Sequence, residues 1–391
     1  WGPSVMSDGR IIWQRSEYVD KGADFSHTLW AIRPDGTQPE LIFGNDIIQP
    51  NGYANGREVP GTSEFLCTLI SHFGDLNGPM ALVDPAMGRF NPDAIRSLTP
   101  EVPWPGMWPR EECFRDGFPI SRDCYLCSHA PQDQFALYVI DRFGNREILY
   151  RDGSLGSMCP TILRVQTVPP VIPDQIDVES EMGEFFLADV YAGMEDQVER
   201  GRVKYLRFCQ EVRADLDQLA DGSYRHDHPS FQDWYATPVH KVSGPNGWPS
   251  YVAKASLGLV PVEEDGSVRF KAPAKKVLYF EALDAELNEL QRMRSVVQLQ
   301  PGEKRSCVGC HEGRNSTPPL EGTMALTRPP RELQPPPWGA VPFAYEEIVQ
   351  PVWDRHCIEC HDSTDKQKVN LTGDPDADKV PASYRTLISQ G

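Results

Sequence analysis

Ser306-Cys307-Val308-Gly309-Cys310-His311 and, about 50 residues later, His356-Cys357-Ile358-Glu359-Cys360-His361 are the two stretches around which this chain is organised. Each contains Cys-x-x-Cys-His, the spacing that attaches a c-type haem. Two thiols three positions apart reach the two vinyl groups of one porphyrin edge, and the adjacent imidazole supplies an iron ligand. The sequence therefore predicts two covalently attached c-type haems. Their expected attachment and axial residues are Cys307, Cys310 and His311, and Cys357, Cys360 and His361.

The same four cysteines permit another interpretation, a four-cysteine zinc ribbon, which also needs cysteine pairs at about this separation. A zinc ribbon leaves His311 and His361 without a role, and the proline-rich connector between the pairs is an awkward hairpin. In that case the chain would carry no haem, and its cysteines would bind zinc instead.

The composition of the chain limits the class of protein. Its 391 residues are enough for two or three domains, and 40% of them are hydrophobic, as in an ordinary globular protein. A net charge of −18 argues against nucleic acid or an anionic membrane and favours a redox partner protein docked by electrostatic steering. No run of 18 apolar residues occurs, so we expect no membrane span.

The cysteines also indicate a compartment. Four of the ten belong to the two motifs, and covalent haem attachment in bacteria takes place outside the cytoplasmic membrane, where disulfides are permitted. We therefore expect a periplasmic or otherwise exported protein. The chain begins at Trp1 without a signal peptide and ends within what resembles an unfinished domain, so we expect a fragment or a processed form. The remaining cysteines are Cys67, Cys113, Cys124, Cys127, Cys159 and Cys209.

Residues 1–170 are expected to form the first, β-rich domain. Short apolar runs alternate with turn signals such as Arg33-Pro34-Asp35-Gly36, and the turn glycines Gly36, Gly88 and Gly144 recur at 52 and 56 residues. A hairpin of this size cannot bury its own face, so neighbouring units must stack. The repeat predicts a partial β-propeller of three units, which do not close a ring.

A second metal site is a weaker hypothesis in this domain. Cys124 and Cys127 lie close to His129, so they could hold an additional metal such as zinc. Positions three apart on a strand point to opposite faces, however, which argues against convergence of the two thiols.

Residues 171–320 are expected to form a β-sandwich-like middle domain that carries the first haem motif. The domain follows a stiff linker, Val168–Pro173, and includes an expected hairpin over 262–270 with Asp265-Gly266 at its turn. Residues 284–294 fit a helix by propensity, but we favour a turn running into a strand. His226, His228 and His240 lie in an aromatic, polar loop, where they are solvated side chains, distal haem ligands or ligands of a second metal.

The last part of the chain divides into a Pro-rich linker, 321–342, and the start of a small α-helical cytochrome c domain, 343–391. A helix over 345–353 is predicted to gather Ile348, Val349, Val352 and Trp353 on one face and to deliver Cys357. No histidine, methionine or cysteine follows His361. The sixth iron ligand therefore lies beyond this sequence, or the iron is five-coordinate.

Four segments carry a family resemblance: Arg115–Ser121, Ile140–Glu147, Val260–Ser267, and Leu299–Glu303 running into Cys307–Glu312. With these segments the chain resembles the hydrazine-synthase-α-related multidomain c-type cytochromes. The resemblance implies a propeller, a middle domain with one c-type haem and a C-terminal cytochrome c domain with another. It also implies other subunits of a multihaem complex as partners.

The resemblance further implies a reaction. In the family, the middle-domain haem joins hydroxylamine and ammonia, its iron is bound by a tyrosine four residues after the motif histidine, and that histidine binds zinc. Here Asn315 occupies the tyrosine position, and an amide cannot act as a phenolate, so His311 returns to the iron. Two functions remain open. One is a haem-dependent oxidoreductase with a catalytic middle-domain haem and a C-terminal electron relay. The other is a non-catalytic electron-transfer or binding protein.

Overall fold

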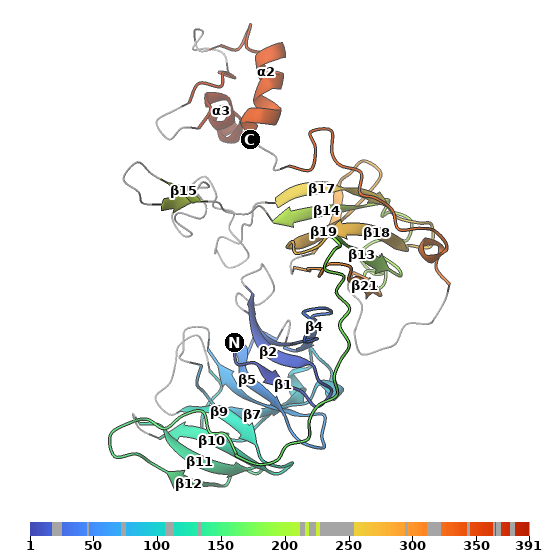
Figure 1. Cartoon of the computed structure of the whole chain (residues 1–391). Coiled ribbons are helices and arrows are strands. Elements are labelled where there is room, and N and C mark those ends of the chain that lie inside the picture. The colour runs from blue at the N-terminus through green and yellow to red at the C-terminus, as the bar shows by residue number, and fades with distance from the viewer. Residues whose placement is uncertain are drawn as a thin grey trace.

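Three bodies follow one another along the chain: a stack of β-strands, a β-sandwich and a group of short helices (Figure 1). The mainly β fold expected from the sequence is confirmed. The computed structural model describes residues 1–17, 26–44, 47–71, 76–105, 113–131, 134–211, 216–218, 224–226, 254–293, 296–310, 322–341, 345–362, 364, 369–375 and 380–390.

The N-terminal body consists of three four-stranded antiparallel meanders in chain order. A single parallel bridge between His27 and Gly52 joins the first meander to the second. The first is β1 (Ser4–Val5), β2 (Ile11–Glu17), β3 (Ser26–Ile32) and β4 (Glu40–Phe43); the second is β5 (Gly52–Glu58), β6 (Phe65–Ile70), β7 (Met80–Val83) and β8 (Ile95–Ser97); the third is β9 (Cys113–Pro119), β10 (Cys124–Ala130), β11 (Ala136–Asp141) and β12 (Arg146–Tyr150). Two 3-10 turns, η1 (Pro85–Met87) and η2 (Pro92–Ala94), connect β7 to β8.

The three turn glycines occupy equivalent places in these meanders. Gly36, Gly88 and Gly144 each lie in the connection between the third and fourth strand, with φ of 81°, 123° and 90°. That left-handed conformation favours glycine. The sequence repeat therefore marks real hairpins, but each unit has four strands rather than the two that were expected.

The second meander is buried on both of its faces. Along β6, Phe65, Cys67 and Leu69 join a core shared with the first meander, whereas Leu66 joins a core shared with the third, beside Tyr125. Because side chains alternate along a strand, a strand packed on both sides reads as a continuous apolar run. The stacking that we expected between neighbouring units is confirmed.

Ion pairs reinforce both contacts between meanders. Arg89, after β7, pairs with Glu40 of the first meander at 2.6 Å. Arg142, in the β11–β12 turn, donates to both carboxylate oxygens of Glu64 in the second meander at 2.9 Å.

Residues 151–181 lead from the third meander to the sandwich without forming strands. On the way they contact the first meander, where Arg33 donates to the carbonyl oxygen of Pro173 at 2.7 Å and Asp35 accepts from the N–H of Gln175 at 2.8 Å. The expected linker and the boundary near residue 170 lie within this segment.

The middle body is a sandwich of two sheets, with strand orders β18-β13-β21 and β17-β14-β19-β20. Its strands are β13 (Met182–Leu187), β14 (Tyr205–Glu211), β17 (Lys254–Pro261), β18 (Val268–Pro273), β19 (Leu278–Leu283), β20 (Glu289–Arg292) and β21 (Lys304–Cys307). A separate small hairpin pairs β15 (Leu216–Gln218) with β16 (Tyr224–His226).

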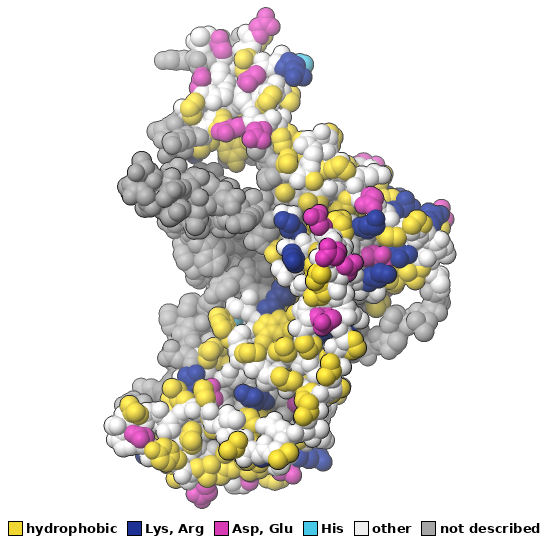
Figure 2. Space-filling model, viewed as in Figure 1, with side chains coloured by type: hydrophobic (Ala, Val, Ile, Leu, Met, Phe, Trp, Pro, Cys, Tyr) yellow, Lys and Arg dark blue, Asp and Glu magenta, His cyan; other side chains and the backbone are white. Residues whose placement is uncertain are grey.

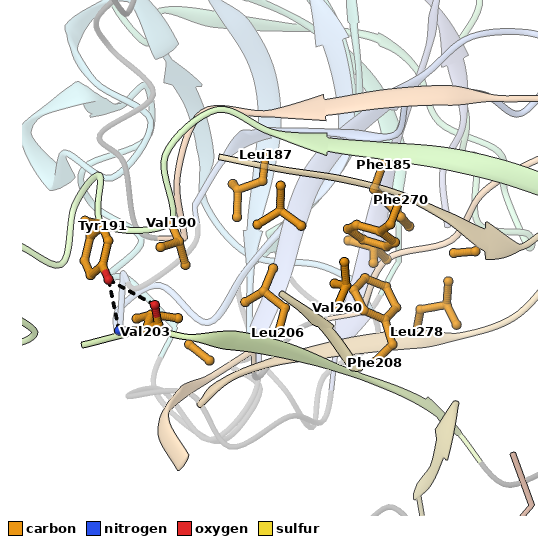
Figure 3. Close-up of a cluster of buried hydrophobic side chains, with 14 of the residues drawn as sticks. Phe185, Leu187, Val190, Tyr191, Val203, Leu206, Phe208, Val260, Phe270 and Leu278 are labelled. Atoms are coloured by element: carbon orange, nitrogen blue, oxygen red, sulfur yellow. Dashed lines mark hydrogen bonds between the residues drawn. The ribbon is translucent and has the colours of Figure 1, made fainter. Parts of the chain in front are cut away.

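Aromatic rings from both sheets meet in the core of the sandwich (Figure 3). Phe208 of one sheet lies 4.2 Å from Phe270 of the other, ring centre to ring centre, and both are at most 1% exposed. At one end of this core, the hydroxyl of Tyr191 accepts from the N–H of Val203 at 2.9 Å (Figure 3). The predicted sandwich is therefore present.

Two expectations for the sandwich have different outcomes. The hairpin predicted over 262–270 is wrong, because β17 pairs with β14 and β18 pairs with β13, so the Asp265-Gly266 turn crosses between the sheets. The local turn signal was correct, but it does not specify the pairing partner. The turn and strand favoured over 284–294 are confirmed by β20.

The expected linker at 321–342 is largely bound to the sandwich. Arg331 exchanges backbone hydrogen bonds with Arg269 and Lys271 of β18, and Gln334 pairs with Leu259 of β17. Glu263 holds the side chains of Arg328 and Arg331, at 3.1 and 2.6 Å. Basic and acidic side chains are accordingly interspersed over the sandwich in Figure 2. A short 3-10 helix, η4 (Met324–Thr327), lies within this segment.

The C-terminal body is a group of short helices. A π-helical turn, η5 (Tyr345–Val349), runs into α2 (Gln350–His356), and α3 (Ala382–Gln390) follows. The expected helix is present, but Val352 is 50% exposed, so it does not share the buried face of α2. Gln350, with 6% exposure, is buried there. In the part of the chain that the structure describes, no helix is long and apolar enough to cross a membrane.

Candidate haem-attachment sites

The second Cys-x-x-Cys-His motif continues directly from α2. The N–H of Cys357 donates to the carbonyl oxygen of Trp353 at 2.8 Å, and Cys357 in turn accepts from the N–H groups of Cys360 and His361 at 3.1 and 3.0 Å. These bonds wind the motif into a tight turn. Cys357 is half-buried and Cys360 is exposed, so both thiols lie at the surface of the module.

The imidazole of His361 is oriented by a backbone carbonyl. Its Nδ1 lies 3.1 Å from the carbonyl oxygen of Val369, which can only accept a hydrogen bond. Nδ1 therefore carries the proton, and Nε2 is left with the lone pair that binds a metal. A backbone bond of 2.9 Å from the N–H of Leu371 to the carbonyl oxygen of His361 holds the same loop in place.

The first motif lies in a different setting, at the end of a strand. β21 runs parallel to β13 and brings Cys307 opposite Leu187. Beyond the strand, Asp189 still donates to the carbonyl oxygen of Val308 at 2.9 Å. A Cβ atom at Gly309 would lie 2.4 Å from the carbonyl oxygen of Ala192, so only glycine fits at that position.

Burial differs between the two thiols of the first motif. Cys307 is partly buried and packs against the sandwich core, whereas Cys310 is exposed. His311, the third residue of the motif, and Asn315 lie outside the described residues. The structure thus brings two of the three predicted residues together at the end of the sandwich.

In the second motif, Cys357 and Cys360 are free thiols, which is the chemical form that thioether attachment needs. Burial raises the pKa of Cys127 to about 12, and it also raises the pKa of Cys67, Cys124 and Cys159.

The hypothesis of a metal at Cys124 and Cys127 has no support in the geometry. Both lie on β10, where Cys127 is fully buried in the core between the second and third meanders and Cys124 is half-buried. The ring of His129 stacks on Phe114 at 3.8 Å, and its Nδ1 is 3.1 Å from the carbonyl oxygen of Cys113. Within the described ranges, no three His, Cys, Asp or Glu side chains gather as a metal site would require.

The candidate histidines of the middle-domain loop are His226, His228 and His240. His226 ends β16, but its side chain and all of His228 and His240 lie outside the described residues. Sequence reasoning missed Val369 and Gln350, which hold the second motif in place. A polar residue within the apolar stripe of a predicted helix was the available signal for Gln350.

The residues of the second motif fit a c-type haem. Two free thiols three positions apart lie at the surface beside an imidazole whose Nε2 is the unprotonated nitrogen. In the first motif, Cys307 and Cys310 have the same spacing.

Two comparisons relate parts of this chain to known proteins. Residues 201–312 match the family model described as the hydrazine synthase alpha subunit middle domain. This segment extends from before β14 to one residue beyond the first motif. No curated protein matches the chain.

A solved structure extends the likeness to nearly the whole fold. The structure titled Kuenenia stuttgartiensis Hydrazine Synthase matches with a TM-score of 0.72 and 18% identity, over 98% of this chain and 59% of that one. The chain thus spans 59% of the length of its structural relative, and the two share their fold.

Proposed function

We propose that this chain, a hydrazine-synthase-alpha-related protein, is a dihaem c-type cytochrome with a redox function. In this proposal Cys307, Cys310 and His311 hold one haem, and Cys357, Cys360 and His361 hold the other. The middle-domain haem acts on small nitrogenous substrates, and the C-terminal haem relays electrons.

The observation that carries the proposal is the hydrogen bond between His361 and Val369. A surface histidine has no need of a fixed tautomer, but a metal ligand does, because only the unprotonated nitrogen can bind iron. Hydrogen bonding of the other ring nitrogen to a carbonyl is the usual support of a metal-bound imidazole. The two free thiols beside it make haem attachment the fitting use of that ligand.

The unequal settings of the motifs support the division of roles. The first motif ends a rigid β-sandwich, and its residues lie within the segment that matches the hydrazine synthase alpha middle domain. The second lies in a small helical module, of the kind that cytochrome c domains use for electron transfer. We therefore assign chemistry to the first haem and transfer to the second.

The remaining parts of the chain fit a role in assembly. We infer that the three stacked meanders are blades of a β-propeller that docks other proteins. A net charge of −18 favours a redox partner with a basic surface. Because c-type haem is attached outside the bacterial cytoplasmic membrane, we propose a periplasmic or otherwise exported location, with other subunits of a multihaem complex as further partners.

The intact mass of the chain tests this proposal. After expression with a haem-attachment system, the mass should increase by two haems, and the pyridine haemochrome spectrum should be of the c type. A chain of unmodified mass that binds zinc through the same cysteines would contradict the proposal and support the zinc-ribbon interpretation.

A second candidate function is electron transfer without catalysis. The charge and the stacked meanders suit a docking protein equally well, whether or not either iron reacts with substrate. Cyanide or nitric oxide distinguishes the two, because an open iron position changes the Soret band on binding. If both haems stay low-spin and unresponsive, the electron-transfer function holds and the catalytic one is excluded.

A further inference from the structure

We propose that Gln350 is a positioning residue for the second haem, because it fixes the loop whose carbonyl orients the imidazole of His361. This inference rests on the proposed function and extends it to a residue outside the Cys-x-x-Cys-His motif. Gln350 acts through the chain segment 369–375, which it contacts at Leu371 and Gly373.

Gln350 is a buried polar side chain with hydrogen bonds at both ends of its amide. It is 6% exposed, and its Nε2 donates to the carbonyl oxygen of Leu371 at 3.1 Å and to Oδ1 of Asp354 at 2.7 Å. Its Oε1 accepts from the hydroxyl of Ser383 at 2.6 Å. A buried amide is retained at little cost only when its polar atoms are satisfied in this way.

The bond to Leu371 connects Gln350 to the imidazole. Leu371 donates its N–H to the carbonyl oxygen of His361 at 2.9 Å, and Val369, two residues earlier, accepts from Nδ1 of His361. The loop is thus tied to the motif on one side and to α2 on the other. Without Gln350, the tie to α2 through Leu371 is lost.

Close packing restricts the loop as well. A Cβ atom at Gly373 would lie 3.2 Å from Cγ and Cδ of Gln350, so the loop backbone lies directly against the glutamine side chain. The same network reaches the other helices, since Ser383 lies in the first turn of α3 and its hydroxyl accepts from the hydroxyl of Tyr345 in η5 at 3.0 Å. Gln350 is therefore the point at which α2, α3 and the loop meet.

The hydrogen bond from Nδ1 of His361 to the carbonyl of Val369 increases the basicity of Nε2. A hydrogen bond from Nδ1 to a carbonyl makes the imidazole a stronger electron donor to a bound iron, which favours the ferric state. A loop that no longer holds Val369 in place weakens that bond. Loss of the Gln350 amide should then raise the reduction potential of the second haem.

The test compares variants that each remove a buried hydrogen bond from this network. Gln350→Met keeps the length of the side chain and removes every bond. Ser383→Ala removes the bond to Oε1 and leaves the one to Leu371. We expect Gln350→Met to shift the midpoint potential of the second haem upward and Ser383→Ala to leave it unchanged. The midpoint of the first haem serves as the internal reference in the full-length holoprotein.

Equal shifts in Gln350→Met and Ser383→Ala, or no shift in Gln350→Met, would overturn the inference, because either result is that of a purely structural residue. Should Gln350→Met fail to fold, Gln350→Asn replaces it. Asparagine keeps the amide but is one methylene too short to hold both Leu371 and Ser383, and the same upward shift is expected.

A readout without haem separates this inference from the proposed function. If the intact mass shows no haem on Cys357 and Cys360, the proposed function fails, and nitrogen-15 NMR of histidine-labelled protein then reports the tautomer of His361, with His361→Ala for assignment. The Nδ1–H tautomer should dominate in the parent chain and give way to a mixture in Gln350→Met. An unchanged tautomer would overturn the positioning role.

Discussion

The carboxylate of Glu303 accepts a hydrogen bond of 2.8 Å from the backbone N–H of Gln38, a residue 265 positions earlier in the chain. Its second oxygen accepts from the N–H of Gln300, also at 2.8 Å, and Glu303 is only 1% exposed. Gln38 has a φ of 52°, a conformation that non-glycine residues rarely adopt. The β3–β4 turn is thus joined to the residue that precedes β21, the strand that ends at Cys307.

Replacing Glu303 should loosen this junction. In Glu303→Ala both backbone N–H groups lose their acceptor, and we expect the free energy of unfolding to fall by about 3 kcal/mol. Urea denaturation measures the change. As a control, Glu332→Ala removes an ion pair with Lys271 in which the glutamate is 68% exposed, and it should cost at most about 0.5 kcal/mol. Similar losses in the two variants would argue against a stabilising junction.

Gly258 should not tolerate a side chain. Its φ is +149°, and a Cβ atom there would lie 2.6 Å from the carbonyl oxygen of Gln334. Gly258→Ala should displace the segment around Gln334 from β17 and lower the free energy of unfolding by about 2–3 kcal/mol. Gly201, with φ of +90° and no atom within 4 Å, is the matched control, since Gly201→Ala adds only backbone strain of about 1–2 kcal/mol. Equal costs in chemical denaturation would contradict the close approach.

Acid should weaken the attachment of the segment that follows the first motif. Burial acts to raise the pKa of Asp265, but hydrogen bonds from the N–H of Met324 and from Ser267 outweigh it, so the pKa lies below its ordinary value. A carboxyl whose folded-state pKa is lowered stabilises the fold above its unfolded pKa, about 4, and loses that contribution as the pH falls through the folded pKa.

The measurement is the difference in unfolding free energy between the parent chain and Asp265→Asn from pH 6 to pH 2. The difference should be constant above pH about 4 and shrink below it. A difference that does not change with pH would show that the charge of Asp265 does not hold Met324.

Each haem should depend on its own motif. Cys307→Ser should reduce the covalent haem from two per chain to one and leave the second module spectrally intact, because the two sites are built on separate bodies. His361→Ala should change the spin state and potential of the second haem only. Cys159→Ser, at an exposed cysteine outside both motifs, is the control and should keep both haems. Loss of both haems in Cys307→Ser would mean that the sites are not independent.

Local sequence patterns predicted most strands. They failed where a strand's burial or its pairing partner depends on distant parts of the chain. The short apolar runs that became β2, β3 and β11 were evident beside their turn signals. The strand β6 was not, because Phe65–Ile70 is apolar on both faces and lacks the alternation of a half-buried strand. The 262–270 hairpin failed because an Asp-Gly turn looks the same whether it joins neighbours or crosses between sheets.

The candidate sites also combine features that local sequence predicts with features that depend on distant contacts. Spacing alone predicts the motif residues, and the period of a strand predicts that Cys124 and Cys127 differ in burial, as they do on β10. It could not identify Val369 or Gln350, because their roles come from a backbone carbonyl and from a loop that approaches α2 only in the folded module. The binding of Arg331 and Gln334 to the sandwich was hidden for the same reason, since proline-rich segments look like free spacers.

Because the connector is fastened to the sandwich as far as Gln334, only residues 335–344 separate that anchor from the first helical turn of the C-terminal module. A linker of this length spans at most about 35 Å. The prolines at its start, Pro335 to Pro337, favour an extended conformation. The module therefore stays within one molecular diameter of the sandwich, at an effective concentration in roughly the millimolar range. An encounter between the sandwich and the helical module is therefore intramolecular, and its frequency does not change when the protein is diluted.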